Sequence, residues 1–368
     1  MIYFDNAATS FPKPKSVIRE VDRCLYKYCG NPGRSSHQLA IAAADKIFEV
    51  RELVADFLDY DKCENIVFTP NATYALNLVI KGLVTHKCHC IVSDLEHNSV
   101  LRPLYKSLTK FGGELSVFDS DLPITEAIVP LIKSDTEIII TTLCSNVTGK
   151  IVDLSQISSI AKSHNLKLVI DASQYLGHLP ISLDGLYYTA FCSAGHKGLF
   201  GIQGSSFALI NNSALFDTLT EGGSGIDSFA KDMPLLLPER YEAGTLPTPA
   251  IASLGAGIDF INRIGVSEIS NQLYILTEEL KNSISNIKSV TLYGAENGIA
   301  AFNIADLPSS YVSNMLDKKG IATRSGFHCA PLIHNKLRTE TRGAVRVSFS
   351  YFNTCKEIYE LCRIIREI

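Results

Sequence analysis

The sequence predicts an α/β fold, in which a large domain with a mostly parallel central sheet is joined to a smaller C-terminal α+β domain. Between about residues 65 and 210, short apolar runs rich in β-branched residues alternate with segments whose apolar residues recur every three or four positions. Runs that are apolar on both faces and separated by helices are typical of a parallel sheet covered by helices. After about residue 250 the pattern changes to two long helical stretches, short strands and a closing helix.

The expected elements follow in order along the chain. Strands are predicted at 65–69, 89–93, 114–118, 137–143, 167–171, 189–193 and 205–210, with helical spacing at 73–84 and 154–165. Farther along, helices are expected at 250–264 and 267–284, and short strands near 290–304 and 344–350. We place the large, cofactor-binding domain at residues 14–250 and the small domain at residues 1–13 and 251–368.

Composition excludes several classes of protein. The 368 residues suffice for about two domains, and with 46% hydrophobic and 20% charged residues the chain is not expected to be disordered. The 34 basic and 38 acidic residues nearly cancel, so neither nucleic acid nor a membrane surface is an expected partner. No apolar run approaches the roughly 18 residues of a membrane span, and the N-terminus lacks the features of an export signal. The ten cysteines are therefore expected to be thiols in the cytoplasm.

Polar side chains follow the predicted strands at the point where each strand ends. In open α/β sheets ligands bind beyond the carboxyl ends of the strands, so these groups are expected to converge on one edge. They are Asn71-Ala72-Thr73, Glu96-His97-Asn98, Ser145-Asn146, Asp171 with Gln174, and Ser193 with His196 and Lys197.

Three of these positions point to one cofactor, although each alone has a simpler explanation. Thr73 opens a helix, where free N–H groups favour a phosphate, but the same position suits an ordinary N-cap. Asp171 ends an apolar strand, where it can pair with a pyridinium N–H or merely cap a loop. Lys197 lies in SAGHKGLFGIQG, where it is either a Schiff-base lysine or a surface lysine. Together they predict pyridoxal 5′-phosphate (PLP) bound to Lys197.

Ten short blocks spread along the chain carry a family resemblance. They are YFDNAAT (3–9), NPGRSSH (31–37), FTPNATYALN (68–77), EHNS (96–99), SNVTG (145–149), IDASQ (170–174), GHKG (195–198), YEAGT (241–245), RSGFHCA (324–330) and RVSFSYFNT (346–354). In this order they resemble the class V aminotransferase superfamily of PLP-dependent transferase fold type I. Within that superfamily, the chain is most similar to the cysteine desulfurases and selenocysteine lyases, group II in particular.

The resemblance implies a role for each cofactor-binding residue. Lys197 would carry the internal aldimine, His97 would stack on the ring, and Asp171 would pair with the ring nitrogen. Gln174 and Asn146 would approach the phenolic oxygen. The phosphate would lie near Ala72, Thr73, Ser193 and His196, with Thr245 reaching in from the second subunit of a homodimer.

The resemblance also implies the substrate site and the nucleophile. Arg346 would hold the substrate carboxylate, and the substrate would be bordered by Ala7, Ala8, Asn146 and Arg324. Cys329, in a short loop, would be the nucleophile, and Arg324 and His328 place positive or polar groups near it. The implied activity is a cysteine desulfurase that converts L-cysteine to L-alanine, leaves a persulfide on Cys329 and passes the sulfur to an acceptor protein.

Other activities on the same cofactor remain open from the sequence. They are a selenocysteine lyase acting on selenocysteine, another C–S lyase and a class V aminotransferase; a catalytically silent scaffold is a further alternative. Several positions depart from the family pattern. Ala72 replaces a common threonine, Ala194 stands where many relatives have Ser or Thr, and Phe327 replaces the first histidine of the usual HHC. NPGRSSH replaces an HRG-type stretch.

The HKCHC segment at 86–90 gathers two histidines and two cysteines. Its spacing matches no known zinc finger, and alternation into the following strand would divide the side chains between two faces. We therefore expect no metal there. Cys144 and Cys192, at strand ends, are explained by packing.

Overall fold

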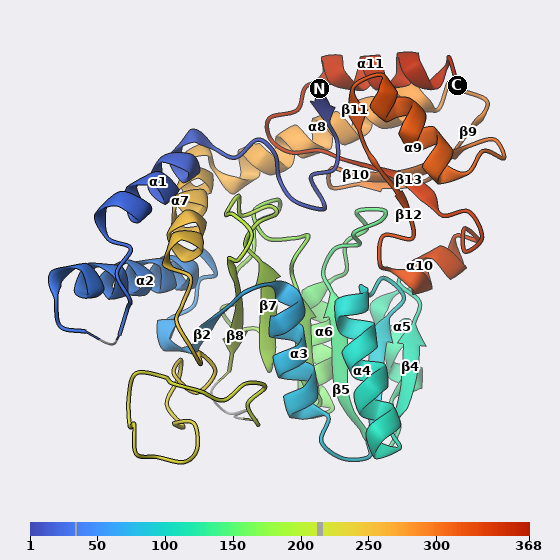
Figure 1. Ribbon diagram of the computed structural model, residues 1–368. Coiled ribbons are helices and arrows are strands. Elements are labelled where there is room, and N and C mark those ends of the chain that lie inside the picture. The colour runs from blue at the N-terminus through green and yellow to red at the C-terminus, as the bar shows by residue number, and fades with distance from the viewer. Residues whose placement is uncertain (34, 212–215) are drawn as a thin grey trace.

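The computed structural model of the protein describes residues 1–33, 35–211 and 216–368, so Arg34 of the NPGRSSH block lies outside the described residues. Two sheets dominate the structure, a large one in the middle of the chain and a smaller one near its C-terminal end (Figure 1). Among the described residues, none of the helices is long and apolar enough to cross a membrane.

The large sheet has seven strands in the order β2-β8-β7-β6-β5-β3-β4. Neighbouring strands in this sheet run parallel to each other, except that β8 is antiparallel to both β2 and β7. The predicted mostly parallel sheet is therefore correct, and each predicted strand matches an observed one within one residue at either end. The strands are β2 (Ile66–Thr69), β3 (His89–Ser93), β4 (Glu114–Phe118), β5 (Thr136–Thr142), β6 (Lys167–Asp171), β7 (Ala190–Ala194) and β8 (Ser206–Ile210).

Helices cover both faces of this sheet. The helices α3 (Ala72–Leu83) and α4 (Asn98–Phe111) bury their apolar faces against one side, in front of the sheet in Figure 1. The other side packs against α2 (Gln38–Phe57), α5 (Ile124–Ile128), α6 (Leu154–Ser163) and α7 (Thr248–Ile264). Two 3₁₀ turns lie at Cys63–Asn65 and Val129–Leu131. Since α3 and α4 directly follow β2 and β3, both helices begin at the edge where those strands end.

The second sheet has four strands in the order β12-β13-β10-β9, all antiparallel. Its strands are β9 (Val290–Glu296), β10 (Ile299–Ile304), β12 (Arg324–Gly326) and β13 (Ala344–Ser348), and its helices are α8 (Val266–Ile284), α9 (Ser309–Lys318) and α11 (Cys355–Ile365). The short helix α10 (Pro331–Lys336) lies between this sheet and the large one (Figure 1).

The N-terminal segment lies against the C-terminal part of the chain. Strand β1 (Ile2–Tyr3) pairs in parallel with β11 (Ile321–Ala322), and Asp5 forms a bridge with Ser348. Helix α1 (Lys15–Lys27) then packs along α7. The domain boundaries at 13/14 and 250/251 stay a prediction.

Candidate active site

A cavity of about 240 Å³ lies at the carboxyl ends of the parallel strands of the large sheet. Every residue predicted for the site lines this cavity except Ser193 and Thr245. The lining residues among the predicted ones are Ala7, Ala8, Ala72, Thr73, His97, Asn146, Asp171, Gln174, His196, Lys197, Arg324, Cys329 and Arg346. Segments from both ends of the chain therefore meet at one place.

Two predicted residues lie elsewhere in this chain. Ser193 is fully buried within β7, and its neighbour Ala194 lines the cavity instead. Successive residues of a strand face opposite sides of the sheet, so only one of the two can face the cavity. Thr245 is exposed and lies outside the cavity. Its predicted role involves a second subunit and stays a prediction.

Lys197 and Asp171 provide a basic and an acidic group on the cavity wall. Burial lowers the pKa of Lys197 to about 8, while the nearby Asp171 carboxylate opposes that shift. Asp171 ends β6, is 5% exposed and accepts a hydrogen bond of 3.0 Å from the Ser173 N–H. A buried carboxylate of this kind favours a cationic N–H donor as its further partner.

His97 is held at the start of α4 in one orientation. Its Nδ1 accepts from the Ser99 N–H at 3.0 Å and lies 2.8 Å from the Ser99 hydroxyl. Since Nδ1 is an acceptor, the ring proton of the neutral imidazole sits on Nε2. Burial lowers the pKa of His97 to about 4, with a further contribution from the Lys197 charge. The ring is therefore neutral near pH 7.

Ser99 was not among the predicted site residues, although the EHNS block contains it. Its hydroxyl also lies 2.7 Å from the Thr73 hydroxyl, so it joins the first turns of α3 and α4. Both helices begin at the cavity, where their free N–H groups and dipoles favour an anion.

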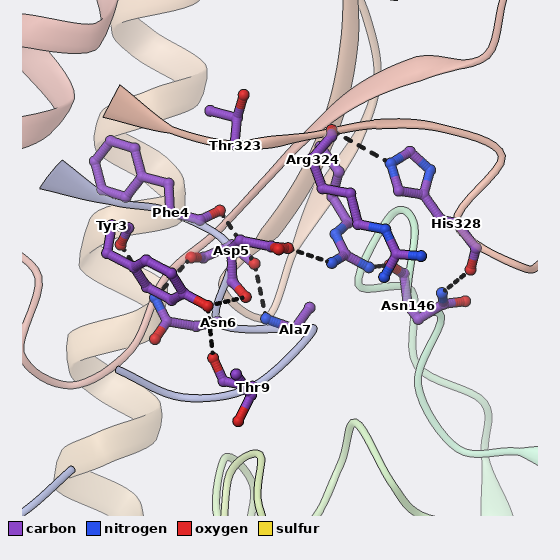
Figure 2. A network of polar contacts seen from close by, with 12 residues as sticks. Tyr3, Phe4, Asp5, Asn6, Ala7, Thr9, Asn146, Thr323, Arg324 and His328 are labelled. Carbon is purple, nitrogen blue, oxygen red and sulfur yellow. Dashed lines mark hydrogen bonds and ion pairs between the residues drawn. The ribbon is translucent and has the colours of Figure 1, made fainter. Parts of the chain in front are cut away.

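Arg346 lies on β13 and is 1% exposed. Its Nη2 donates to the Asp5 carboxylate at 2.7 Å, and its Nη1 donates to the Asn146 carbonyl at 2.9 Å. The buried Nε has no partner among the described residues. Figure 2 shows the network around Asp5, Ala7 and Asn146. Sequence reasoning missed Asp5, although it belongs to the YFDNAAT block, because no local signal shows its partner 341 residues away.

Cys329 is exposed and lies in the turn between β12 and α10. Its carbonyl accepts from the Asn98 N–H at 2.6 Å, and the Arg324 Nη2 lies 3.9 Å from its Sγ. Cys329 also lines a second hollow along α3 and α4, where Lys81, Arg102 and Lys106 lie. The thiol is therefore placed between the cavity and an open, positively charged surface.

The donor set of the cavity fits PLP. Asp171 can accept a pyridine N–H, Lys197 is an amine of lowered pKa, and the first turn of α3 can receive a phosphate. Two buried side-chain oxygens on the wall, Asn146 Oδ1 and Gln174 Oε1, have no partner within the described part of the chain.

Two other cysteines near strand ends differ from Cys329. Cys144 lines the cavity but is buried, and burial raises the pKa of its thiol to about 12. Cys192 is fully buried and does not line the cavity. Both thiols are therefore protonated near pH 7, which makes them poor nucleophiles.

The HKCHC segment places its side chains apart from the cavity. The two ring nitrogens of His89 lie 2.7 Å from the Thr136 hydroxyl and 2.8 Å from the Ser116 hydroxyl. His86 pairs with Glu137 at 2.6 Å. Within residues 1–33, 35–211 and 216–368, no group of three His, Cys, Asp or Glu side chains is arranged to hold a metal ion.

A larger hollow, of about 430 Å³, lies beside α2. Three carboxylates line it, those of Asp45, Glu64 and Glu239, and so do Arg51 and Glu242, which form a bidentate pair with both N···O distances 2.9 Å. The pair is buried and Glu242 also accepts from the Phe68 N–H at 2.7 Å, so its charges are already satisfied. The described residues that line this hollow include no lysine, histidine or cysteine, so they offer no amine, imidazole or thiol of the kind found at the smaller cavity.

Comparisons with known proteins identify the family. The family described as aminotransferase class-V matches residues 2–361. The chain belongs to the class-V aminotransferase family. A relative from Methanothermobacter thermautotrophicus, named "Probable cysteine desulfurase", is 33% identical over 380 residues, covering 100% of this chain and 94% of the relative. A "Cysteine desulfurase" from Yersinia pestis is 30% identical, covering 100% of this chain and 93% of the relative.

A solved structure shows the same class-V fold. The apo structure of a cysteine desulfurase from Thermococcus onnurineus aligns with a TM-score of 0.91 at 31% identity, covering 100% of this chain and 94% of that chain. The predicted superfamily and the PLP fold type I architecture are confirmed by these likenesses.

Proposed function

We propose that this member of the class-V aminotransferase family is a PLP-dependent cysteine desulfurase. It converts L-cysteine to L-alanine and keeps the sulfur as a persulfide on Cys329. The observation that supports this most is the meeting of Lys197, Asp171, His97, Arg346 and Cys329 at one cavity. The relatives named cysteine desulfurase support the same reaction.

The cofactor would be held by groups at the ends of five strands, β2, β3, β5, β6 and β7. Asp171 would accept from the pyridine N–H, His97 would stack on the ring, and Asn146 and Gln174 would face the phenolic oxygen. The phosphate would lie against Ala72, Thr73 and His196, at the N-terminus of α3. When bound, PLP withdraws electrons from the Cα of an amino-acid substrate.

The side chains of the cavity bind the substrate and move its proton. Arg346 is fixed by Asp5 and the Asn146 carbonyl, which leaves its Nε for the substrate carboxylate beside Ala7, Ala8 and Arg324. Burial lowers the pKa of Lys197 to about 8, so its amine gives up a proton more readily than that of an ordinary lysine. The neutral amine can accept the Cα proton.

Cys329 then takes the sulfur. Its thiolate attacks the substrate Sγ, so that an S–S bond forms while the Cβ–S bond breaks and its electron pair passes to the substrate carbon. Protonation of that carbon, Cβ, and return of a proton from Lys197 to Cα then give alanine. A thiol on a sulfur-acceptor protein would remove the terminal sulfur, and the surface beside Cys329 gives such a partner access. We further propose that the protein is cytoplasmic, where such thiols are reduced, and homodimeric, with Thr245 of each subunit near the other's phosphate.

The proposed function is tested by incubating the purified holoprotein with L-cysteine and measuring alanine together with persulfide on Cys329. We expect Cys329→Ala to lose at least 99% of the persulfide while keeping the absorbance of the bound cofactor. Cys144→Ala is the matched control, because Cys144 also lines the cavity but is a buried thiol of raised pKa. It is expected to retain wild-type persulfide.

Each other outcome of this experiment has a definite meaning. Alanine without persulfide on Cys329 in the wild type, or full sulfide release by Cys329→Ala, would contradict the assignment of the nucleophile. Amino transfer to a keto acid without sulfur release would indicate an aminotransferase. Turnover of selenocysteine but not of cysteine would indicate a selenocysteine lyase.

A further inference from the structure

The backbone around Cys329 has a conformation that needs support from its surroundings. His328 and Cys329 are consecutive non-glycine residues in the left-handed region, with φ of 49° and 56°. A single residue of this kind costs about 1 kcal/mol and persists only when neighbouring contacts hold it. The contacts that hold this turn therefore decide where the Cys329 thiol lies.

Two of these contacts come from the large domain. The Asn98 N–H donates to the Cys329 carbonyl at 2.6 Å, and the Asn146 side chain donates to the His328 carbonyl at 2.7 Å. Buried His328 also stacks on His334 of α10, with the two facing ring nitrogens 3.2 Å apart. The turn is therefore fixed relative to α10, so the position of α10 helps to determine where Cys329 lies.

At its C-terminal end, α10 is tied to the large sheet by one side chain. The Lys336 ammonium lies 2.7 Å from an oxygen of Asp94, 2.5 Å from Asp119 and 2.7 Å from Asp121. Asp94 is 7% exposed and follows β3, and the other two carboxylates follow β4. An ammonium shared by three carboxylates, one of them buried, is held more firmly than an exposed single pair.

The loop after β3 links this ion cluster to the site. It contains Asp94, which binds Lys336, and His97, which lines the cavity, and it ends at Asn98, the first residue of α4, whose N–H donates to the Cys329 carbonyl. We propose that Lys336 is a positioning residue, which holds Cys329 over the cavity by fastening α10 to the loops that follow β3 and β4. The inference rests on the proposed function, since the thiol needs this placement in order to meet the substrate sulfur.

The test compares Lys336→Met with wild type as holoproteins. Without the ammonium, Asp94 and Asp119 lose their cation while Lys150 stays beside Asp121, and α10 is held to the large domain by apolar contacts such as that of Leu332. We expect L-cysteine to persulfidate Cys329 about 10-fold more slowly, with the L-cysteine concentration for half-maximal rate unchanged within twofold. Hydrogen exchange in the peptide spanning 325–340 should become at least 10-fold faster. Lys336→Arg should recover most of both properties.

Lys133→Met is the matched control, because Lys133 pairs with a single exposed carboxylate, that of Glu114 at the start of β4. It should leave both measurements within twofold of wild type. If Lys336→Met does not fold, Asp119→Asn is used, and we expect it to speed exchange in 325–340 about threefold.

Some results would overturn the inference. It is wrong if exchange in 325–340 is the same in Lys336→Met and Lys133→Met, or if persulfidation stays within twofold of wild type. Absence of persulfide from the wild type with L-cysteine would instead defeat the proposed function, and the exchange measurement would still decide whether Lys336 fastens α10.

Discussion

At the scale of single residues, Glu96 is a charged group that the proposed chemistry does not use. It is fully buried directly before His97. One carboxyl oxygen, Oε1, accepts from the Ser93 hydroxyl at 2.5 Å and from the Thr142 N–H at 2.7 Å. The other, Oε2, has no partner among the residues that the structure describes. Burial raises the pKa of Glu96 to about 8. The side chain is therefore protonated near neutral pH and serves to link β3 to β5.

This shift predicts how stability depends on pH. The folded state holds the Glu96 proton more tightly than the unfolded chain, whose ordinary value is near 4.5, so the free energy of unfolding falls as pH rises from about 4.5 to about 8. Glu96→Gln keeps the acceptor oxygen and removes the titration. We measure the free energy of unfolding of the variant and of wild type in urea. The variant's value minus the wild-type value should rise by on the order of 4 kcal/mol from pH 5 to pH 9.

The exposed carboxylate of Glu126 supplies the control for that measurement. Glu126→Gln should follow the wild-type pH profile in parallel. A difference between Glu96→Gln and wild type that stays constant with pH would show that Glu96 is ionised in the folded protein across this range.

At the scale of elements, the first turn of α3 combines a structural cap with a binding site. The Asn71 side chain accepts from the Tyr74 N–H at 2.8 Å, and Asn71 also lines the cavity. Asn71→Ala removes the cap and should lower the free energy of unfolding by about 1 kcal/mol. Asn71→Asp keeps a capping oxygen but adds a negative charge beside the proposed phosphate. It should retain stability and weaken PLP binding roughly 10-fold.

The effects on stability and on PLP affinity are measured separately. Urea unfolding gives the stability, and titration with PLP of the protein from which PLP has been removed gives the affinity. Asn71→Ser, which keeps a neutral cap, should be close to wild type in both. Unchanged PLP affinity in Asn71→Asp would mean that the phosphate does not lie at this helix end.

The elements also show what the sequence could and could not predict. The strands of the large sheet were predictable because they are buried on both faces, so their apolar runs stand out from the helices between them. The cavity followed from the polar residues at their ends. Whether Ser193 or Ala194 faces the cavity depends on which side chains of β7 point to each face of the sheet. A strand that is apolar on both faces does not show this in its sequence. The pairing of β1 with β11 and of Asp5 with Arg346 joins distant segments and has no local pattern.

At the scale of the whole molecule, one long segment without helix or strand carries apolar side chains that this chain leaves uncovered. Within residues 216–247, Phe229 is fully exposed, and Leu235 and Leu236 are 72% and 63% exposed. Thr245 lies at the end of the same segment. Large apolar side chains exposed along one segment would gain from being covered by another protein surface. They fit the proposed homodimer, in which the segment of one subunit lies against the other and brings Thr245 to its phosphate.

We therefore expect Phe229→Asp combined with Leu236→Asp to dissociate the dimer, because burying two carboxylates in an apolar contact is costly. Sedimentation of the holoprotein should shift from dimer to monomer, and PLP affinity should fall roughly 10-fold through loss of one phosphate contact. Tyr274→Asp, at an exposed position of α8, should change neither property. Thr245→Ala should weaken PLP binding and leave the dimer intact. A wild-type monomer that binds PLP as tightly as the dimer would contradict the role of Thr245 across subunits.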